Sequence, residues 1–227
     1  MDEKRKKDNE RIAIARAFLK AVEETDFEHH EPLDKVLAAL PDMKVKEGFV
    51  VDYFFDGGFT GGGTIVYCRR MDDAPIESYD HYGKGEREFS RDEWDTALKA
   101  CPDWLEALEM PMTEDGIWQT HLLVNVSKHV MPLFWHGLYA RRQYLFTIRD
   151  YKALEDSITQ KRPHYDIELC PEVEMVADGV FLVQDTYFNN WSGVMRGQYL
   201  YLTTNGKLIT KDLLAKTQVE HECGICF

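Results

Sequence analysis

The hydrophobic positions near the N-terminus recur with the period of an α-helix. Apolar residues fall three or four positions apart at Ile12, Ala15, Leu19 and Val22. This spacing predicts an amphipathic helix over residues 5–24. A second, shorter helix is predicted over residues 32–40, because proline suits the first helical turn and Pro41 ends the apolar face.

The pattern then changes to one typical of β-strands. Residues 49–55 and 64–70 are rich in β-branched and aromatic side chains, and a glycine-rich stretch separates them. We therefore predict an antiparallel hairpin with a long connection. Residues 76–82 are expected to add a third strand.

The middle of the chain gives one strong and one ambiguous signal. Residues 90–110 are predicted to be helical, because Ser90 and Glu93 form a capping box and apolar positions follow at helical spacing. Pro102 predicts a kink in this helix. Residues 117–129 fit either a buried helix or a strand, and we favour the strand.

The last third of the sequence is rich in strand patterns. A strand is predicted over residues 142–148, followed by a helix over 151–157 that Asp150 would cap. The dipeptides Asp178-Gly179 and Asn205-Gly206 each separate two apolar runs, which predicts two tight hairpins. A final short helix is expected over residues 211–216.

Together these elements predict an α+β fold. We expect an antiparallel sheet of about six to eight strands, covered by N-terminal and central helices. Hydrophobic residues make up 44% of the sequence, which is enough for a core. Residues 1–227 are expected to form a single domain, with disordered termini over 1–8 and 217–227.

The charge and the cysteines restrict the classes of function. A net charge of -13 disfavours binding to nucleic acid or to anionic membranes. The chain has no apolar stretch long enough for a membrane span, and its first residues do not resemble a signal peptide. The five cysteines are irregularly spaced, unlike a secreted disulfide framework. These features predict a cytoplasmic protein.

The charge is concentrated in one block. Residues 72–115 contain fourteen acids and four bases, whereas residues 116–149 contain no acid. The favoured hypothesis is an interaction protein that binds a basic partner, such as a protein that neutralises a toxin. Its expected binding residues lie on the acidic helix face: Asp92, Asp95, Glu106 and Glu109.

The alternative hypothesis is an enzyme built from the glycine-rich loop and the acid-free block. The loop would contact a ligand through Gly58, Phe59, Thr60 and Gly62. It lacks the lysine of a phosphate-binding loop, and a strand is predicted to follow it. The candidate catalytic residues are His121, His129 and His136, although separate packed histidines explain the same pattern.

Two further groups of residues are candidate binding sites. His221, Cys223 and Cys226 provide fewer than the four ligands of a structural zinc site, so a loose tail is favoured over a metal site. No cofactor is predicted, and the sequence leaves the oligomeric state open. Aromatic residues cluster at the ends and on alternating faces of the predicted strands, where core packing is favoured over a ligand-binding sheet face: Tyr187, Phe188, Trp191, Tyr199 and Tyr201.

Overall fold

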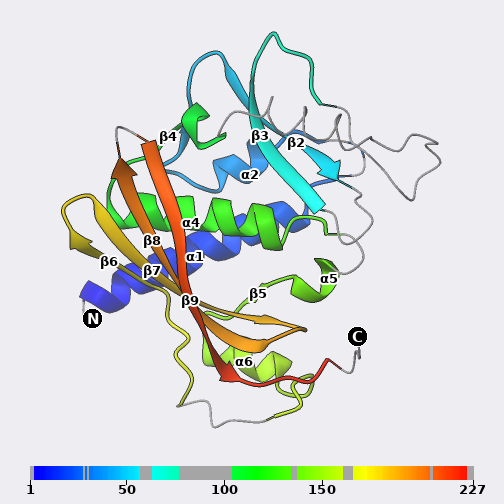
Figure 1. Ribbon diagram of the computed structural model, residues 1–227, viewed down its shortest axis with the longest axis vertical. Helices are drawn as coiled ribbons and strands as arrows, with labels where there is room; N and C mark the ends of the chain where they lie inside the picture. The colour runs from blue at the N-terminus through cyan, green and yellow to red at the C-terminus, as the bar shows by residue number, and fades with distance from the viewer. Residues whose placement is uncertain are drawn as a thin grey trace.

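The structure is a computed structural model that describes residues 3–27, 29, 31–56, 63–76, 104–133, 137–160, 166–204 and 207–223 (Figure 1). Its helical elements are α1 (Glu3–Glu23), α2 (Asp34–Ala38), a 3-10 turn (Trp104–Ala107), α4 (Glu114–His129), α5 (Gly137–Ala140) and α6 (Ile148–Leu154). Its strands are β1 (Lys44–Val45), β2 (Phe49–Asp56), β3 (Gly63–Arg70), β4 (Leu108–Glu109), β5 (Gln143–Tyr144), β6 (Glu172–Ala177), β7 (Val180–Asn189), β8 (Gly193–Thr204) and β9 (Lys207–Val219).

The main sheet has five antiparallel strands. Its order is β5-β7-β8-β9, and β6 pairs with the same strand β7 as β5 does. Both predicted hairpins are confirmed: Gly179 has a φ of 66° between β6 and β7, and Thr204 pairs with Lys207 between β8 and β9. The expected helix over 211–216 is wrong, because these residues belong to β9 and their backbone pairs with β8.

Helix α4 corrects the prediction of a strand over residues 117–129. Thr113 caps the helix by accepting a hydrogen bond from the Gly116 N–H at 3.1 Å, and acids occupy the first turn. All side chains over 116–127 are buried, so this part of the helix has no solvent-exposed face. A helix that is buried on every side lacks the amphipathic helical period, which explains why its sequence resembles a buried strand.

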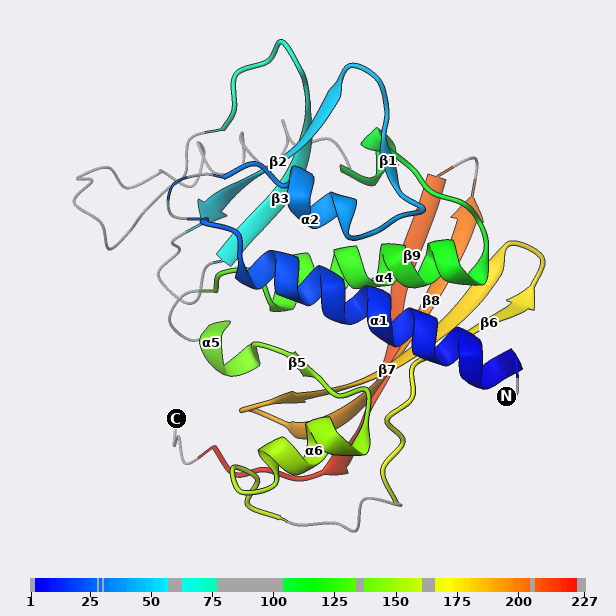
Figure 2. The same cartoon turned by 180° about the vertical axis from the view of Figure 1, so that it is seen from behind.

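The elements form layers around α4. The main sheet covers one side of α4, and α1 lies on the other side (Figures 1 and 2). Arg11 on α1 is buried and bonds to Glu114 and Asp115, while the Trp118 indole donates to the Arg11 carbonyl at 3.0 Å. These contacts hold α1 against α4, which contributes Ile117, Trp118, Leu122, Leu123 and Val126 to the core.

The β2–β3 hairpin packs at the C-terminal end of α4, as a separate two-stranded sheet. It confirms the predicted pairing of residues 49–55 with 64–70. The Thr64 N–H donates to the Pro132 carbonyl at 3.0 Å, which joins the hairpin to the chain that leaves α4. The third strand predicted over 76–82 lies almost wholly outside the described residues, and Ile76 is not in a strand.

Other boundaries differ from the predictions. The helix expected over 90–110 is described only from residue 104, where the chain forms a 3-10 turn and then β4. The strand expected over 142–148 is limited to β5, because Thr147 starts α6 by accepting from the Asp150 N–H. The α+β class is confirmed, although the largest described sheet has five strands and is covered by α4 and α1.

Helix α1 begins at Glu3 and β9 extends to Val219, so regular structure enters both stretches that we expected to be disordered. None of the helices in the described part of the chain is long and apolar enough to cross a membrane.

Candidate functional site

A fully buried histidine and aspartate face each other between α4 and β7. His121 Nε2 lies 2.9 Å from Asp185 Oδ2, and both side chains have no exposed surface. On β7 the inward positions alternate, so Asp185 stands in the row of Phe181 and Val183. Because an unpaired carboxylate inside a protein is costly, this contact fixes how the helix and the sheet dock.

The other nitrogen of His121 continues the polar chain. His121 Nδ1 lies 2.9 Å from the Tyr201 hydroxyl and 3.1 Å from the Asn125 amide nitrogen. If Nε2–H donates to the carboxylate, then Nδ1 is free to accept from both neighbours. The ring also stacks on Trp118 with the centroids 5.5 Å apart. His121 is therefore held on every side and has no surface for a ligand.

Arg142 links this buried chain to the surface. Its Nη1 donates to Asn125 Oδ1 at 2.9 Å and to the Tyr199 hydroxyl at 2.7 Å. Its guanidinium carbon lies 4.1 Å from the centroid of the Tyr187 ring, a cation–π contact. The Arg142 N–H donates to the His129 carbonyl, which ties the start of β5 to the end of α4. The cation is thus fixed at both its backbone and its head group.

Gly197 makes the space that this arrangement needs. It pairs with Asp185 across β7 and β8, and a Cβ added to it would lie 2.5 Å from the Tyr199 hydroxyl. Only glycine, which has no Cβ, leaves room at position 197 for the Tyr199 ring to lie over the strand. The glycine therefore positions the hydroxyl that Arg142 contacts.

Burial controls the protonation of the surrounding groups. Loss of solvent raises the pKa of Tyr199, Tyr201 and Tyr144 above the usual value for tyrosine, and the Asp185 charge adds to the effect. These phenols therefore stay protonated and neutral. Burial, together with the Arg142 and Lys128 charges, lowers the pKa of His129 to about 3. Arg142 is consequently the cation of this site.

A cleft of about 670 Å³ opens over Arg142. It lies where α5, β5 and α6 meet the C-terminal part of α1, elements that lie together in Figure 2. Its polar lining consists of Glu23, Arg141, Arg142, Gln143, Ser157 and Asn190. Arg142 makes no ion pair with any carboxylate of the described residues, and the two hydrogen bonds given above for its head group both come from Nη1. The cleft therefore presents a guanidinium group that forms no ion pair with a carboxylate of the described residues.

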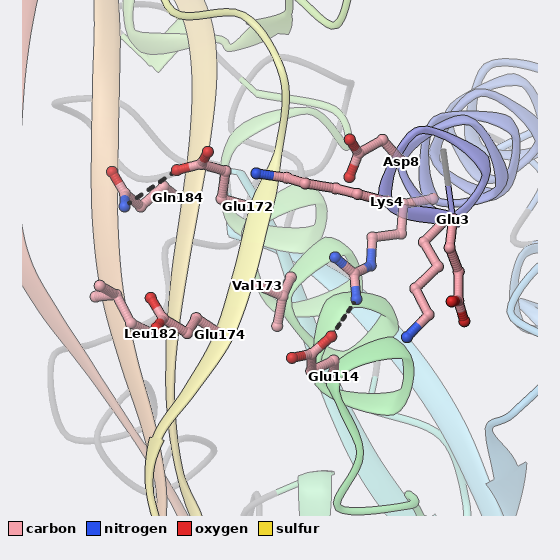
Figure 3. Close-up of a pocket in the computed structure, with 11 residues that line it drawn as sticks. Glu3, Lys4, Asp8, Glu114, Glu172, Val173, Glu174, Leu182 and Gln184 are labelled. Atoms are coloured by element: carbon pink, nitrogen blue, oxygen red, sulfur yellow. Dashed lines mark hydrogen bonds and ion pairs between the residues drawn. The ribbon is translucent and has the colours of Figure 1, made fainter. Parts of the chain in front are cut away.

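A second groove of about 590 Å³ lies between α1 and β6 (Figure 3). Acids and bases are mixed along its walls: Lys4 on α1 points toward Glu172 on β6, and Arg11 bonds to Glu114 at 2.9 Å. Glu172 also accepts from the Gln184 amide at 3.5 Å. Because these charges face one another, the groove favours no ligand charge, and the Arg142 cleft is the stronger candidate.

The structure places two of the three predicted catalytic histidines. His121 is buried in the chain described above, and His129 lies two turns later on α4 with its ring half-buried. His136 lies outside the described residues. The loop residues Gly58, Phe59, Thr60 and Gly62 also lie outside them, and Gly63 bridges to Leu133 beyond the end of α4.

The other predicted sites are largely untested. Glu109 is exposed at the end of β4, whereas Asp92, Asp95 and the Glu106 side chain lie outside the described residues. Binding of a basic partner therefore stays a prediction. His221 packs against Phe188 and its Nδ1 is buried without a partner, Cys223 is a free thiol, and Cys226 is not described. Within the described ranges no three His, Cys, Asp or Glu side chains are grouped to hold a metal ion.

The sequence patterns did not identify most of the residues that build the site. A signal existed for Asp185, because it is a charge at an inward position of an alternating apolar strand. His121 and Asn125 are polar residues four positions apart, which indicates a shared partner once the segment is known to be helical. Arg142 had no such signal, since its position depends on long-range packing.

Comparison of the chain with protein-family models, with curated proteins and with solved structures gave no match.

Proposed function

We propose that the protein binds a small ligand that carries an oxyanion next to an apolar portion. The observation that supports this most directly is the fixed guanidinium of Arg142 in an open cleft, without a carboxylate partner among the described residues. The planar fork of arginine matches a carboxylate or phosphate group. Oxygen atoms of the ligand would accept hydrogen bonds from Nε and Nη2.

The charge of the cleft favours this class of ligand. Arg141 and Arg142 both line it, and Glu23 is the lining carboxylate. The protein as a whole has a net charge of -13, so a site with two arginines contrasts with the average surface. A local positive potential of this kind attracts an anion and repels a cation.

The walls of the cleft favour a ligand with an apolar part. They include Leu19, Val130, Leu138, Leu154 and Phe188. The cleft volume of about 670 Å³ falls within the range of about 300–1,000 Å³ that is typical of small-molecule sites. Apolar walls with a few convergent polar groups are the usual composition of such sites.

The buried chain behind Arg142 would serve as a rigid support. Asn125 and Tyr199 hold Nη1, and His121, Tyr201 and Asp185 hold Asn125 and its neighbours in turn. A cation that is already ordered loses little further conformational entropy when a ligand binds. His121 itself is not exposed, so we assign it a positioning role and not a catalytic one.

Calorimetric titration tests the proposal with four probes: octanoate, octyl phosphate, octanamide and inorganic phosphate. We expect octanoate or octyl phosphate to bind at least about tenfold more tightly than octanamide, because only the charged head groups engage Arg142. Comparing the affinities of octanoate and octyl phosphate shows whether the site prefers a carboxylate or a phosphate group. Inorganic phosphate alone should bind weakly, since it makes no contact with the apolar walls.

The variants are chosen to separate binding from folding. Arg142→Gln should weaken the charged probe at least about tenfold, while Arg149→Gln removes an equal charge from exposed α6 outside the cleft and should not. Ser157→Trp provides a second variant that fills the cleft from an exposed position. Equal binding of octanoate and octanamide, or unchanged affinity in both cleft variants, would contradict the proposal.

A further inference from the structure

The face of the main sheet that is turned away from α4 carries a group of apolar side chains. Among the described elements, α1 and α4 lie behind the sheet in Figure 1, and the start of α1 reaches its front only at the β6 edge, where Glu174 and Leu182 line the groove between α1 and β6. On this face lie Val180, Leu182, Leu200, Leu202, Ile209 and Leu214. Ile209 is 44% exposed and Leu214 is 63% exposed, and the other four are partly exposed. We call these six residues the outer face.

The strand register places opposite charges at the two ends of one row on the outer face. Glu174 on β6 pairs with Leu182 on β7, which pairs with Leu200 on β8, which pairs with Lys211 on β9. The row therefore runs from an acid, through two leucines, to a base. Both charged side chains are exposed, and neither takes part in an ion pair within the described part of the chain.

We propose that the outer face is the contact between two copies of this chain. A twofold axis that runs parallel to the strands, between β7 and β8, exchanges β6 with β9 when two such faces are stacked. It places Glu174 of one copy over Lys211 of the other, twice, and packs Leu182 against the partner's Leu200. The neighbouring row, in which Val180 pairs with Leu202 and Leu202 with Ile209, adds apolar contact on the same side of the interface.

The complementarity within one row identifies a second copy as the occupant. The acid and the base lie on edge strands that are equally far from the axis, so the same chain supplies both halves of each ion pair. Two sheets stacked about 10 Å apart allow such side chains to meet. Within one chain they are three strand spacings apart, about 14 Å, and cannot pair.

Sedimentation equilibrium over about 1–200 µM protein tests this inference through a charge exchange. The unchanged protein should be a dimer at the upper end of this concentration range. Glu174→Lys and Lys211→Glu should each weaken the dimer at least about tenfold, because like charges then oppose each other at both ends of the row. The double variant Glu174→Lys/Lys211→Glu should return to within about threefold of the unchanged protein, since the pairs are restored in reverse.

The control is Glu109→Lys, which reverses an exposed acid on β4, outside the main sheet, and should leave the dimer unchanged. Circular dichroism confirms that each variant keeps its sheet. A protein that is monomeric at every concentration overturns the inference. So does a dimer that tolerates both single changes, or one that the double variant does not restore.

Discussion

His121 Nε2 lies 2.9 Å from Asp185 Oδ2, and neither side chain has exposed surface. The pair joins the central helix to the central strand of the main sheet. Asp185 Oδ1 is buried with no hydrogen-bond partner among the described atoms, so its carboxylate depends strongly on the contact through Oδ2. Removing the histidine would leave a buried charge with little to stabilise it.

We expect His121→Leu to lower the free energy of unfolding by about 3–5 kcal/mol, measured by urea denaturation. The double variant His121→Leu/Asp185→Leu should recover part of this loss, because it also removes the stranded carboxylate. The matched control is His29→Leu, whose ring lies 2.7 Å from Asp26 with 82% of the side chain exposed. The control should leave the unfolding curve unchanged. Similar losses at His121 and His29 would show that the buried pair has no special role.

Gly197→Ala tests whether Tyr199 positions Arg142. The added methyl group would overlap the Tyr199 hydroxyl, so the ring must shift and its contact with Nη1 must lengthen. We expect the affinity for the charged probe to fall about tenfold, although no charged group is removed. Thr203→Ala, at an exposed position on the same strand, serves as the control in the same titration. If Gly197→Ala and Thr203→Ala bound the charged probe equally well, Gly197 would have no role in positioning Arg142.

His129 should make the stability depend on pH. Burial holds its pKa at about 3, below the value of 6.5 for a free histidine, so the unfolded chain takes up the proton first as the pH falls. Stability attributable to this ring is present above pH 6.5 and is lost between about pH 6.5 and 3.

Replacing His129 with glutamine should remove this dependence. Relative to the variant, the unchanged protein should lose about 2 kcal/mol of unfolding free energy between pH 7.5 and pH 5. Urea denaturation at the two pH values measures the difference. Parallel pH profiles for the two proteins would indicate that the ring titrates normally in the folded state.

Local sequence patterns predicted the elements whose partners are close in the chain. The first helix, the β2–β3 hairpin and the two hairpins of the main sheet all follow from period and turn residues. The prediction failed where burial removes the period. Helix α4 is surrounded by α1, the main sheet and β3, so its residues 116–127 are buried on all sides and show no amphipathic pattern. Residues 211–216 of β9 were predicted to be helical because these residues, all exposed, do not alternate between apolar and polar.

The site was harder to predict because it joins distant segments. His121, Asp185 and Tyr201 come from three parts of the chain, and their contacts span 64 and 80 residues. The sequence suggested His121 and the tyrosines as separate groups, with core packing as the alternative. Only the docking of α4 on the main sheet shows that they form one polar chain ending at Arg142.

The most direct test of the ligand site is an NMR titration of the arginine side chains. In ¹⁵N-labelled protein, the Nε–H signal of Arg142 is identified by its absence in Arg142→Lys. Addition of octanoate or octyl phosphate, whichever binds more tightly, should shift this signal with the same dissociation constant that calorimetry gives. The signals of Arg11 and Arg196, which are buried in other ion-paired networks, should not move. An unmoved Arg142 signal at saturating probe would contradict the account.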